Sequence, residues 1–312
     1  MDQAEGLRTL IDRSGQEETL SPPVPFREPN MKGQRSPRVI AVSSGKGGVG
    51  KTNVVANLAL GLTRLRKRVL VLDADLGLAN IDVLLGLTPR YTIEQFFNQE
   101  KRFSEIIIQG PGGIAIIPAG SGVFDLVDLS ESQKLYLQSE LDLLAEEVDI
   151  LLIDTGAGIS RNVLYFNMAA HESIILATPE PTSITDAYAL IKVLSTRFEK
   201  KRFSILVNVV SNEREAREVF LKISRVADRF LRSLSLDYLG FIPFDEKIPE
   251  AVRLQKAVLE LYPQAPSSRS LLGVAKSLLE RSGPNDGKGG IQFFWQQLLD
   301  RPRTSEKERR ME

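Results

Sequence analysis

Hydrophobic residues in this chain fall into short, nearly continuous runs that are separated by longer stretches with a helical repeat. The runs are rich in Val, Ile and Leu and lack polar alternation, which is typical of strands buried on both faces. They cover residues 38–43, 68–72, 114–118, 150–153, 173–177, 204–209 and 238–242. A helical stripe between the first two runs, within residues 52–66, consists of Val54, Val55, Leu58, Leu62 and Leu65. This alternation predicts an α/β fold with a doubly wound, mostly parallel sheet.

Composition divides the chain into three segments. Residues 1–36 are polar, and prolines at positions 22, 23, 25 and 29 predict an extended linker after a short helical stretch. Residues 37–280 contain all of the strand and helix alternation and form the expected α/β domain. Residues 281–312 begin with a Gly-rich linker and continue with a short amphipathic helix and a charged tail. We therefore expect an N-terminal arm, one large domain and a C-terminal appendage.

Composition also excludes several classes of protein. The 312 residues are 42% hydrophobic and 26% charged, which is ordinary for a globular protein. Lys plus Arg equals Asp plus Glu at 40 each, so bulk charge does not favour nucleic acid as a partner. The absence of Cys excludes disulfides, Cys-ligated zinc and iron–sulfur clusters. No signal peptide and no apolar stretch of roughly 18 residues is present, so we expect a cytoplasmic protein.

A glycine-rich segment between the first strand and the first helix has the pattern of a phosphate-binding loop. It fills G-x-x-x-x-G-K-[ST] with Gly45, Lys46, Gly47, Gly48, Val49, Gly50, Lys51 and Thr52. Glycines let backbone N–H groups close around phosphate oxygens, and the positive end of the following helix adds to the attraction. Lys51 is expected to neutralise the β- and γ-phosphates, and the Thr52 hydroxyl to bind Mg²⁺.

Three carboxylates follow predicted strands, at the sheet edge where ligands bind in open α/β folds. Asp73 and Asp75 follow the strand at 68–72, and Asp154 follows the strand at 150–153. Asp154 has the Walker B position and is expected to hold Mg²⁺ through water, with residues 155–160 as a switch that senses the γ-phosphate. Asp73 and Asp75 have an alternative role, because either carboxylate can cap the segment that follows it.

Lys46 gives the loop the form K-G-G-x-x-G-K-T, which resembles the deviant Walker loop of the MinD/ParA (SIMIBI) ATPases. The resemblance implies that Lys46 reaches across an ATP-dependent homodimer to the nucleotide of the partner. It also implies that Asp75 orients or deprotonates the attacking water and that Asp73 lies near the magnesium shell. Lys46, Lys51 and Asp75 are then the catalytic set, and Mg-ATP is the cofactor. The alternative for Lys46 is that it only adds positive charge beside the loop.

The resemblance extends to the purine site. In MinD-like proteins an Asn at a strand end binds the adenine edge, and Asn208 follows Val207 at the end of the strand expected at 204–209. The segment formed by Pro243, Phe244 and Asp245 follows the last strand and is expected to pack on the base. Both patterns are also common turn sequences. No guanine-specific N-K-x-D is present in the expected place, which favours ATP over GTP.

The C-terminal appendage contains one apolar helical face. Its residues are Ile291, Phe294, Trp295, Leu298 and Leu299. This pattern resembles the membrane-targeting helix of MinD-type proteins and implies reversible binding at the inner face of the cell membrane. The surrounding residues are mostly uncharged, which departs from that family and predicts weak attraction to anionic lipids. The alternatives are a helix packed permanently on its own domain, or one released on dimerisation.

The N-terminal arm resembles a second family signature. Residues 2–8 match D-Q-A-x-x-L-R, the activating motif of the FlhG-type (FleN, YlxH) flagellar-number regulators, and residues 75–86 and 110–113 are also similar. The resemblance implies that the arm stimulates an FlhF-like SRP GTPase and that the chain acts with flagellar basal-body and C-ring components. The residues expected to contact the GTPase are Asp2, Gln3, Ala4, Leu7 and Arg8.

Four other functions fit parts of the pattern. A division-site MinD shares the chemistry but not the D-Q-A arm. A ParA-type DNA partitioner requires a basic surface, for which the sequence offers only the cluster Arg197, Lys200, Lys201 and Arg202, more typical of a solvated helix end. A metabolic synthetase of the same superfamily has no use for the two terminal appendages. A scaffold without hydrolysis predicts loss of Asp75 or Asp154, and both are present.

Overall fold

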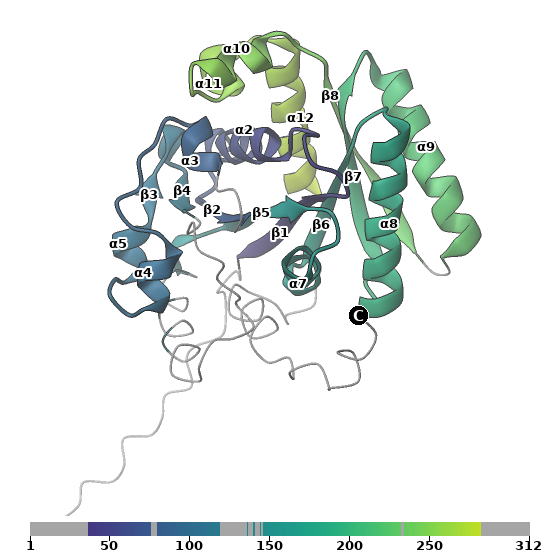
Figure 1. Cartoon of the computed structure of the whole chain (residues 1–312). Helices are drawn as coiled ribbons and strands as arrows, with labels where there is room; N and C mark the ends of the chain where they lie inside the picture. The colour runs from purple at the N-terminus through teal and green to yellow at the C-terminus, as the bar shows by residue number, and fades with distance from the viewer. Residues whose placement is uncertain are drawn as a thin grey trace, which may run out of the picture. The chain divides into compact units, whose positions relative to one another are not determined.

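The fold is known from a computed structural model that describes residues 37–75, 80–118, 136, 140, 144, 146–231 and 234–281 (Figure 1). The chain divides into two units, Met1–Gln34 and Arg35–Glu312, and all described residues belong to the second. The last described helix ends at Glu280. The expected boundaries at residues 36 and 281 remain predictions.

Within the described residues, eight strands form one sheet in the order β3-β4-β2-β5-β1-β6-β7-β8. Their bounds are β1 Arg38–Ser44, β2 Val69–Ala74, β3 Ile108–Gln109, β4 Ala115–Ile117, β5 Ile150–Ala157, β6 Glu172–Ala177, β7 Arg202–Val210 and β8 Ser235–Pro243. Every neighbouring pair is parallel except β3 and β4, which are antiparallel. The seven predicted runs correspond to the seven parallel strands. The sequence did not indicate β3, because two residues are too few to form a hydrophobic run.

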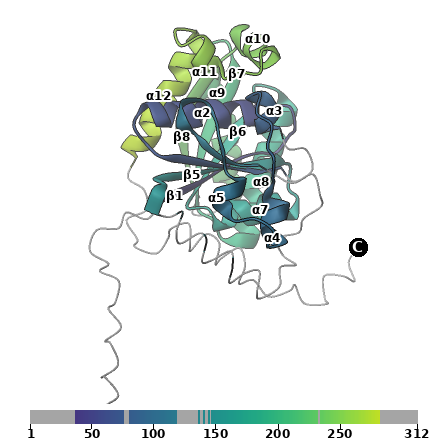
Figure 2. The same cartoon turned by 90° about the vertical axis from the view of Figure 1, so that its left-hand side faces the viewer.

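Helices cover both faces of the sheet (Figures 1 and 2). The helical segments are α2 Lys51–Arg64, α3 Ile81–Leu84, α4 Ile93–Phe97, α5 Phe103–Ile106, the 3-10 turn η1 Pro111–Gly113, α7 Arg161–Ala169, α8 Pro181–Phe198, α9 Glu213–Phe230, α10 Lys247–Arg253, α11 Val258–Leu261 and α12 Pro266–Glu280. One hydrophobic cluster joins α2 and α12 to one face of the sheet. Two further clusters join α4, α5 and α7, and then α8 and α9, to the other face. The predicted doubly wound α/β fold is therefore confirmed.

Strand β1 shows why the hydrophobic runs lack alternation. Val39 and Ala41 pack into the cluster beneath α7, whereas Ile40 and Val42 pack into the cluster beneath α2. All four side chains are fully buried. Successive side chains of a strand point to opposite faces, so a strand covered on both faces needs apolar residues at every position.

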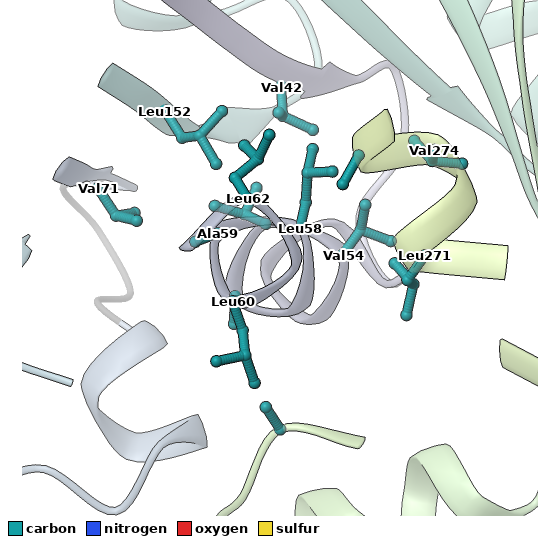
Figure 3. Packing of buried hydrophobic residues seen from close by; sticks show 14 of the residues in the cluster. Val42, Val54, Leu58, Ala59, Leu60, Leu62, Val71, Leu152, Leu271 and Val274 are labelled. Carbon is teal, nitrogen blue, oxygen red and sulfur yellow. The ribbon is translucent and has the colours of Figure 1, made fainter. Parts of the chain in front are cut away.

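Helix α2 lies at the centre of one layer. Figure 3 shows Leu58 and Leu62 directed toward the sheet residues Val42 and Leu152, with Leu60 on the opposite side of the helix. Leu60 is also buried, so the predicted stripe describes only the face that meets the sheet. The outer face is covered partly by α12, where a Cβ on Gly61 would lie 3.2 Å from the Cβ of Ala275. This burial on all sides gives the start of α2 a rigid support.

Candidate functional site

The phosphate-binding loop connects β1 to α2, as the sequence predicts. Gly48 and Gly50 have φ angles of 78° and 87°, in the left-handed region that favours glycine. A Cβ on Gly45 would lie 2.1 Å from a backbone carbon of Asp186 in α8, so a side chain at position 45 has no room. The loop is thus shaped by glycines on one side and by the first turns of α8 on the other.

A buried ion pair lies behind this loop. Lys51 Nζ donates to Asp154 Oδ1 at 2.7 Å, and the two side chains are only 7% and 1% exposed. Burial raises the pKa of Asp154, while the charge of Lys51 and hydrogen bonds from Lys51 and Thr52 act in the opposite direction. The pair brings two predicted site residues together from elements about a hundred positions apart in the chain, α2 and β5.

The other oxygen of Asp154 fits a magnesium site. Asp154 Oδ2 is buried and has no hydrogen-bond partner among the described residues. A buried carboxylate oxygen without a donor is costly unless a ligand or water completes it. The described residues include no cluster of three or more side chains of the metal-binding types. Thr52 and Asp154 would therefore hold Mg²⁺ together with water and phosphate oxygens, the ligand set this ion prefers, and the ion would neutralise phosphate charge.

Asp73 has a different environment. Its Oδ1 accepts from the backbone N–H of Asp75, and its Oδ2 accepts from the N–H groups of Asn80 and Ile81. Burial and the neighbouring charge of Asp154 raise its pKa to about 7, and the three backbone donors oppose that shift. Both oxygens are engaged in holding the chain around the start of α3, which favours the capping role. Proximity to magnesium remains a prediction, although β2 and β5 pair Asp73 directly with Asp154.

Asp75 is half-buried and faces the carboxyl end of β5, where the predicted switch of residues 155–160 begins. A Cβ on Gly156 would lie 3.6 Å from Asp75 Oδ1, so the carboxylate lies against the predicted switch. Thr155 at the start of that segment is buried and shares a hydrogen bond of 2.8 Å with Ser43. Ile159 further along is 52% exposed. The segment is therefore anchored at its beginning and exposed toward its end.

Lys46 lies on the outside of the loop. Its Nζ donates to Glu180 Oε2 at 2.5 Å and to Thr182 Oγ1 at 3.1 Å, both at the start of α8. The side chains of Lys46 and Glu180 are 39% and 62% exposed. Lys46 and Lys51 thus differ in position, since one lysine faces the surface and the other is buried behind the phosphate loop.

A pocket of about 180 Å³ opens beside the loop, and its lining includes Asn208, Pro243, Phe244 and Asp245 from the predicted base site. Asn208 Nδ2 donates to the Val49 carbonyl at 2.8 Å, and Asn208 Oδ1 has no partner among the described residues. An amide oxygen is an acceptor for a group such as the amino group of adenine, and recognition of the base by Asn208 stays a prediction. Phe244 is 64% exposed and offers a ring for packing on a base.

Asp245 and Val209 also line this pocket, and both contribute to its structure. Asp245 accepts from the Lys247 N–H and from the N–H and hydroxyl of Ser267, so its carboxylate joins the end of β8 to α12. Val209 has a φ of 58°, an outlier for a β-branched residue, at the point where the register between β7 and β8 shifts. No pattern in the sequence indicates the irregularity that follows Asn208.

Sequence reasoning also missed two asparagines of α2, Asn53 and Asn57. Asn53 lines the pocket, and Asn57 is fully buried. A signal was present, because two amides spaced by four residues interrupt an otherwise apolar helix. The predicted partner residues 2–8 and membrane residues 291–299 lie outside the described residues. No helix in the described part of the chain is long and apolar enough to cross a membrane.

Comparison with known proteins agrees with this geometry. Residues 40–258 match the family of CobQ/CobB/MinD/ParA nucleotide-binding domains. The chain belongs to this family, and it is accordingly a nucleotide-binding ATPase that uses ATP with Mg²⁺. The predicted resemblance to MinD and ParA is confirmed.

Two curated relatives cover most of the chain. The antiactivator FleN of Pseudomonas aeruginosa is 44% identical over 267 residues, which are 86% of this chain and 95% of that protein. The flagellum site-determining protein YlxH of Helicobacter pylori is 35% identical over 265 residues, 84% of this chain and 90% of that protein. These similarities confirm the resemblance to the FleN and YlxH group.

Solved structures share the fold. The MinC:MinD cell division protein complex of Aquifex aeolicus has a TM-score of 0.64 and 27% identity, covering 79% of this chain and 97% of that chain. The septum site-determining protein MinD of Pyrococcus horikoshii, complexed with Mg-ADP, has a TM-score of 0.61 and 21% identity, covering 78% and 96%.

Proposed function

We propose that this chain is an ATP-dependent dimerising switch that regulates flagellar number or placement. The observation that carries the switch is the position of Lys46, which lies on the surface beside the phosphate loop instead of behind it. Its partners Glu180 and Thr182 are exposed, and an exposed ion pair contributes only about 0–1 kcal/mol. Lys46 is therefore able to exchange these partners for the phosphates of a second subunit at little cost.

The test is Lys46→Ala, made in an Asp75→Ala background so that hydrolysis does not end the ATP state. We expect ATP affinity to stay within about tenfold, or about 1.4 kcal/mol, while the ATP-dependent dimer is lost in size-exclusion chromatography with light scattering. Lys101→Ala is the matched control, because Lys101 also forms an exposed pair, with Glu105. A dimer that persists in Lys46→Ala contradicts the proposed role of Lys46 across the interface.

The flagellar part of the proposal rests on the relatives. FleN is named an antiactivator and YlxH a flagellum site-determining protein, and this chain covers at least 90% of each. Division-site MinD proteins share the fold at lower identity. DNA partitioning is not supported by the cluster Arg197, Lys200, Lys201 and Arg202, because Lys200 donates to the carbonyls of Asn167 and Ala170 instead of facing nucleic acid.

The finer proposal is that the arm of residues 1–36 activates an FlhF-like SRP GTPase. Its support is the D-Q-A-x-x-L-R match at residues 2–8 and the Pro-rich spacer that follows. A synthetic peptide of residues 1–20 should raise GTP hydrolysis by the cognate GTPase without ATP or the ATPase domain. Gln3→Ala should remove most of this stimulation and leave ATP hydrolysis by the full chain unchanged. No effect of the unmodified peptide would contradict this partner.

We also propose that residues 291–299 bind the membrane reversibly. Partial insertion of five apolar side chains is a weak anchor for one chain, and a dimer with two such helices gains avidity. Liposome co-sedimentation should therefore be stronger with ATP than with ADP and should disappear when residues 291–312 are removed. Equal sedimentation with both nucleotides would separate membrane binding from the switch.

A further inference from the structure

Two side-chain amides in α2 form a relay that begins at α11. The backbone N–H of Leu259 donates to Asn57 Oδ1 at 2.9 Å. Asn57 Nδ2 in turn donates to the Asn53 carbonyl at 2.8 Å and to Asn53 Oδ1 at 3.2 Å. A backbone N–H only donates and a carbonyl only accepts, so these contacts determine which way the Asn57 amide faces. The Asn53 amide then receives its hydrogen bond on the oxygen side.

This orientation of the Asn53 amide leaves its Nδ2 donor outside the relay. Asn53 Nδ2 is a buried atom with no hydrogen-bond partner among the described residues, and Asn53 lines the pocket beside the phosphate loop. Asn208 contributes the opposite chemistry to the same pocket, since its Nδ2 is held by the Val49 carbonyl and its Oδ1 has no partner in the part of the chain that the structure describes. Two residues of the pocket lining thus carry one unpaired acceptor and one unpaired donor among the described residues, and the other atom of each amide is held by a contact within the protein.

A purely structural role accounts poorly for this arrangement. Asn is a weak helix former, and the neighbouring positions Val54 and Val55 are apolar and buried. Asn57 makes three hydrogen bonds within the protein, through both atoms of its amide, so its role in the relay is complete. Asn53 Nδ2 is the member of the relay that remains unpaired, and a buried amide donor without a partner is unfavourable. The ligand of the pocket is the group able to complete it.

We propose that Asn53 donates a hydrogen bond from Nδ2 to an acceptor on the nucleoside monophosphate part of ATP. Two acceptors suit this position. One is an oxygen of the α-phosphate, because Asn53 lies in the first turn of α2 directly after Thr52. The other is the ring nitrogen N7 of the purine, because the pocket also contains Asn208 and Phe244. Asn57 is a positioning residue, which holds the Asn53 amide in the donating orientation from α11.

The first test measures ATP binding to the full chain by fluorescence or calorimetry. Asn53→Ala should weaken ATP binding by roughly tenfold, the loss expected for one hydrogen bond to a charged or strongly polar acceptor. Asn53→Asp keeps the shape and replaces the donor with a carboxylate, so it should weaken binding more than Asn53→Ala does. Asn98→Ala, at an exposed helix end outside the pocket lining, is the control. Binding by Asn53→Ala within twofold of the unmodified chain would overturn the proposal.

The second test separates positioning from general destabilisation. Asn57→Ala should weaken ATP binding less than Asn53→Ala, and the double variant should bind no worse than Asn53→Ala alone, because the relay acts only through Asn53. A merely destabilising change would add to the loss. Thermal melting of each nucleotide-free variant is measured first, and Asn57→Ser replaces Asn57→Ala if the latter melts near the assay temperature. Additive losses would overturn the relay.

Analogues identify the acceptor. If Asn53 contacts the purine, the loss caused by Asn53→Ala should disappear with 7-deaza-ATP, which has a C–H group in place of the ring nitrogen N7. If it contacts the α-phosphate, the loss should shrink with one of the two α-thio diastereomers of ATP. A loss that persists in full with all three analogues would overturn the assignment to these two acceptors.

Discussion

The carboxyl ends and the amino ends of the parallel strands are both rich in charged and polar side chains. The two ends differ in how the hydrogen bonds of these side chains are completed. At the carboxyl ends of the strands, Asp154 Oδ2, Asn208 Oδ1 and Asn53 Nδ2 are buried and lack partners among the described residues. At the opposite end, Arg38 pairs with Glu172 at 2.6 Å, and Arg281 donates to Ser204 and to the Tyr238 carbonyl. The first end thus leaves buried polar atoms available to a ligand, whereas at the second end the protein itself pairs most of its polar groups.

His171 is one exception at the opposite end. The backbone N–H of Val39 donates to His171 Nδ1 at 3.1 Å, and its buried Nε2 has no partner among the described residues. Burial, together with the charges of Lys200 and Arg38, lowers its pKa, so the ring is neutral near pH 7. A neutral ring is less costly to leave half-satisfied than a charge. The comparison teaches that unpaired buried atoms mark a ligand site when several of them share one pocket.

The largest effect is expected from breaking the buried pair at the nucleotide end. Lys51→Ala leaves the Asp154 carboxylate without its cation, so the free energy of unfolding should fall by about 3–5 kcal/mol, and triphosphate binding should be lost. The double variant Lys51→Met with Asp154→Asn should recover most of the stability and none of the ATP binding. Urea unfolding and nucleotide titration measure the two quantities. Recovery of ATP binding in the double variant would contradict the role of Lys51.

The free energy of unfolding of the nucleotide-free protein should depend on pH because of Asp73. Its pKa is about 7 in the folded state against 3.8 ordinarily, so the folded state holds the proton more tightly than the unfolded state. The resulting stabilisation is fully present below about pH 4 and is lost as the pH rises to about 7, with a total of up to roughly 4 kcal/mol. Urea unfolding between pH 4 and pH 8 should show this decline. The control Asp73→Asn should lack it, and an equal slope in both proteins would contradict the shift.

Asp75→Ala tests chemistry without changing the bound nucleotide. Asp75 lies against Gly156 and is not part of the Lys51–Asp154 pair, so Mg-ATP affinity should be close to normal. Loss of a group that acts on the attacking water should slow hydrolysis by at least about a hundredfold, or about 2.7 kcal/mol. Phosphate release and nucleotide titration measure the two effects. Near-normal phosphate release would exclude Asp75 as the catalytic carboxylate.

A substitution at the end of the sheet away from the nucleotide site provides a comparison with these variants. Lys200 donates to the carbonyls of Asn167 and Ala170 at the end of α7, so Lys200→Met should lower the free energy of unfolding by about 1–2 kcal/mol. ATP affinity should stay unchanged, because no nucleotide-site residue contacts Lys200 within the described part of the chain. A change of more than threefold in ATP affinity would show that the two ends are coupled.

The sequence predicts those features of the fold and site that leave a regular pattern of residues. Buried parallel strands leave continuous hydrophobic runs, and the phosphate loop leaves a fixed spacing of Gly, Lys and Thr, so both were found at the right places. It could not predict which oxygen of Asp73 meets which N–H, because that depends on how the chain returns at Asn80. The relay from Leu259 to Asn53 is missed for the same reason, since it joins segments that are distant in the chain. Strand β3 is missed because its two residues are too few to form a hydrophobic run.

The backbone at Val209 has a consequence for how stable this protein is able to be. A β-branched residue in the left-handed region is strained by about 1–3 kcal/mol, and here that strain accompanies the register shift beside Asn208. Val209→Gly should relieve the strain and raise the melting temperature, while the looser strand end should weaken ATP binding several-fold. Selection for heat resistance alone would then act against nucleotide recognition at this position, so the two traits are opposed in a single residue.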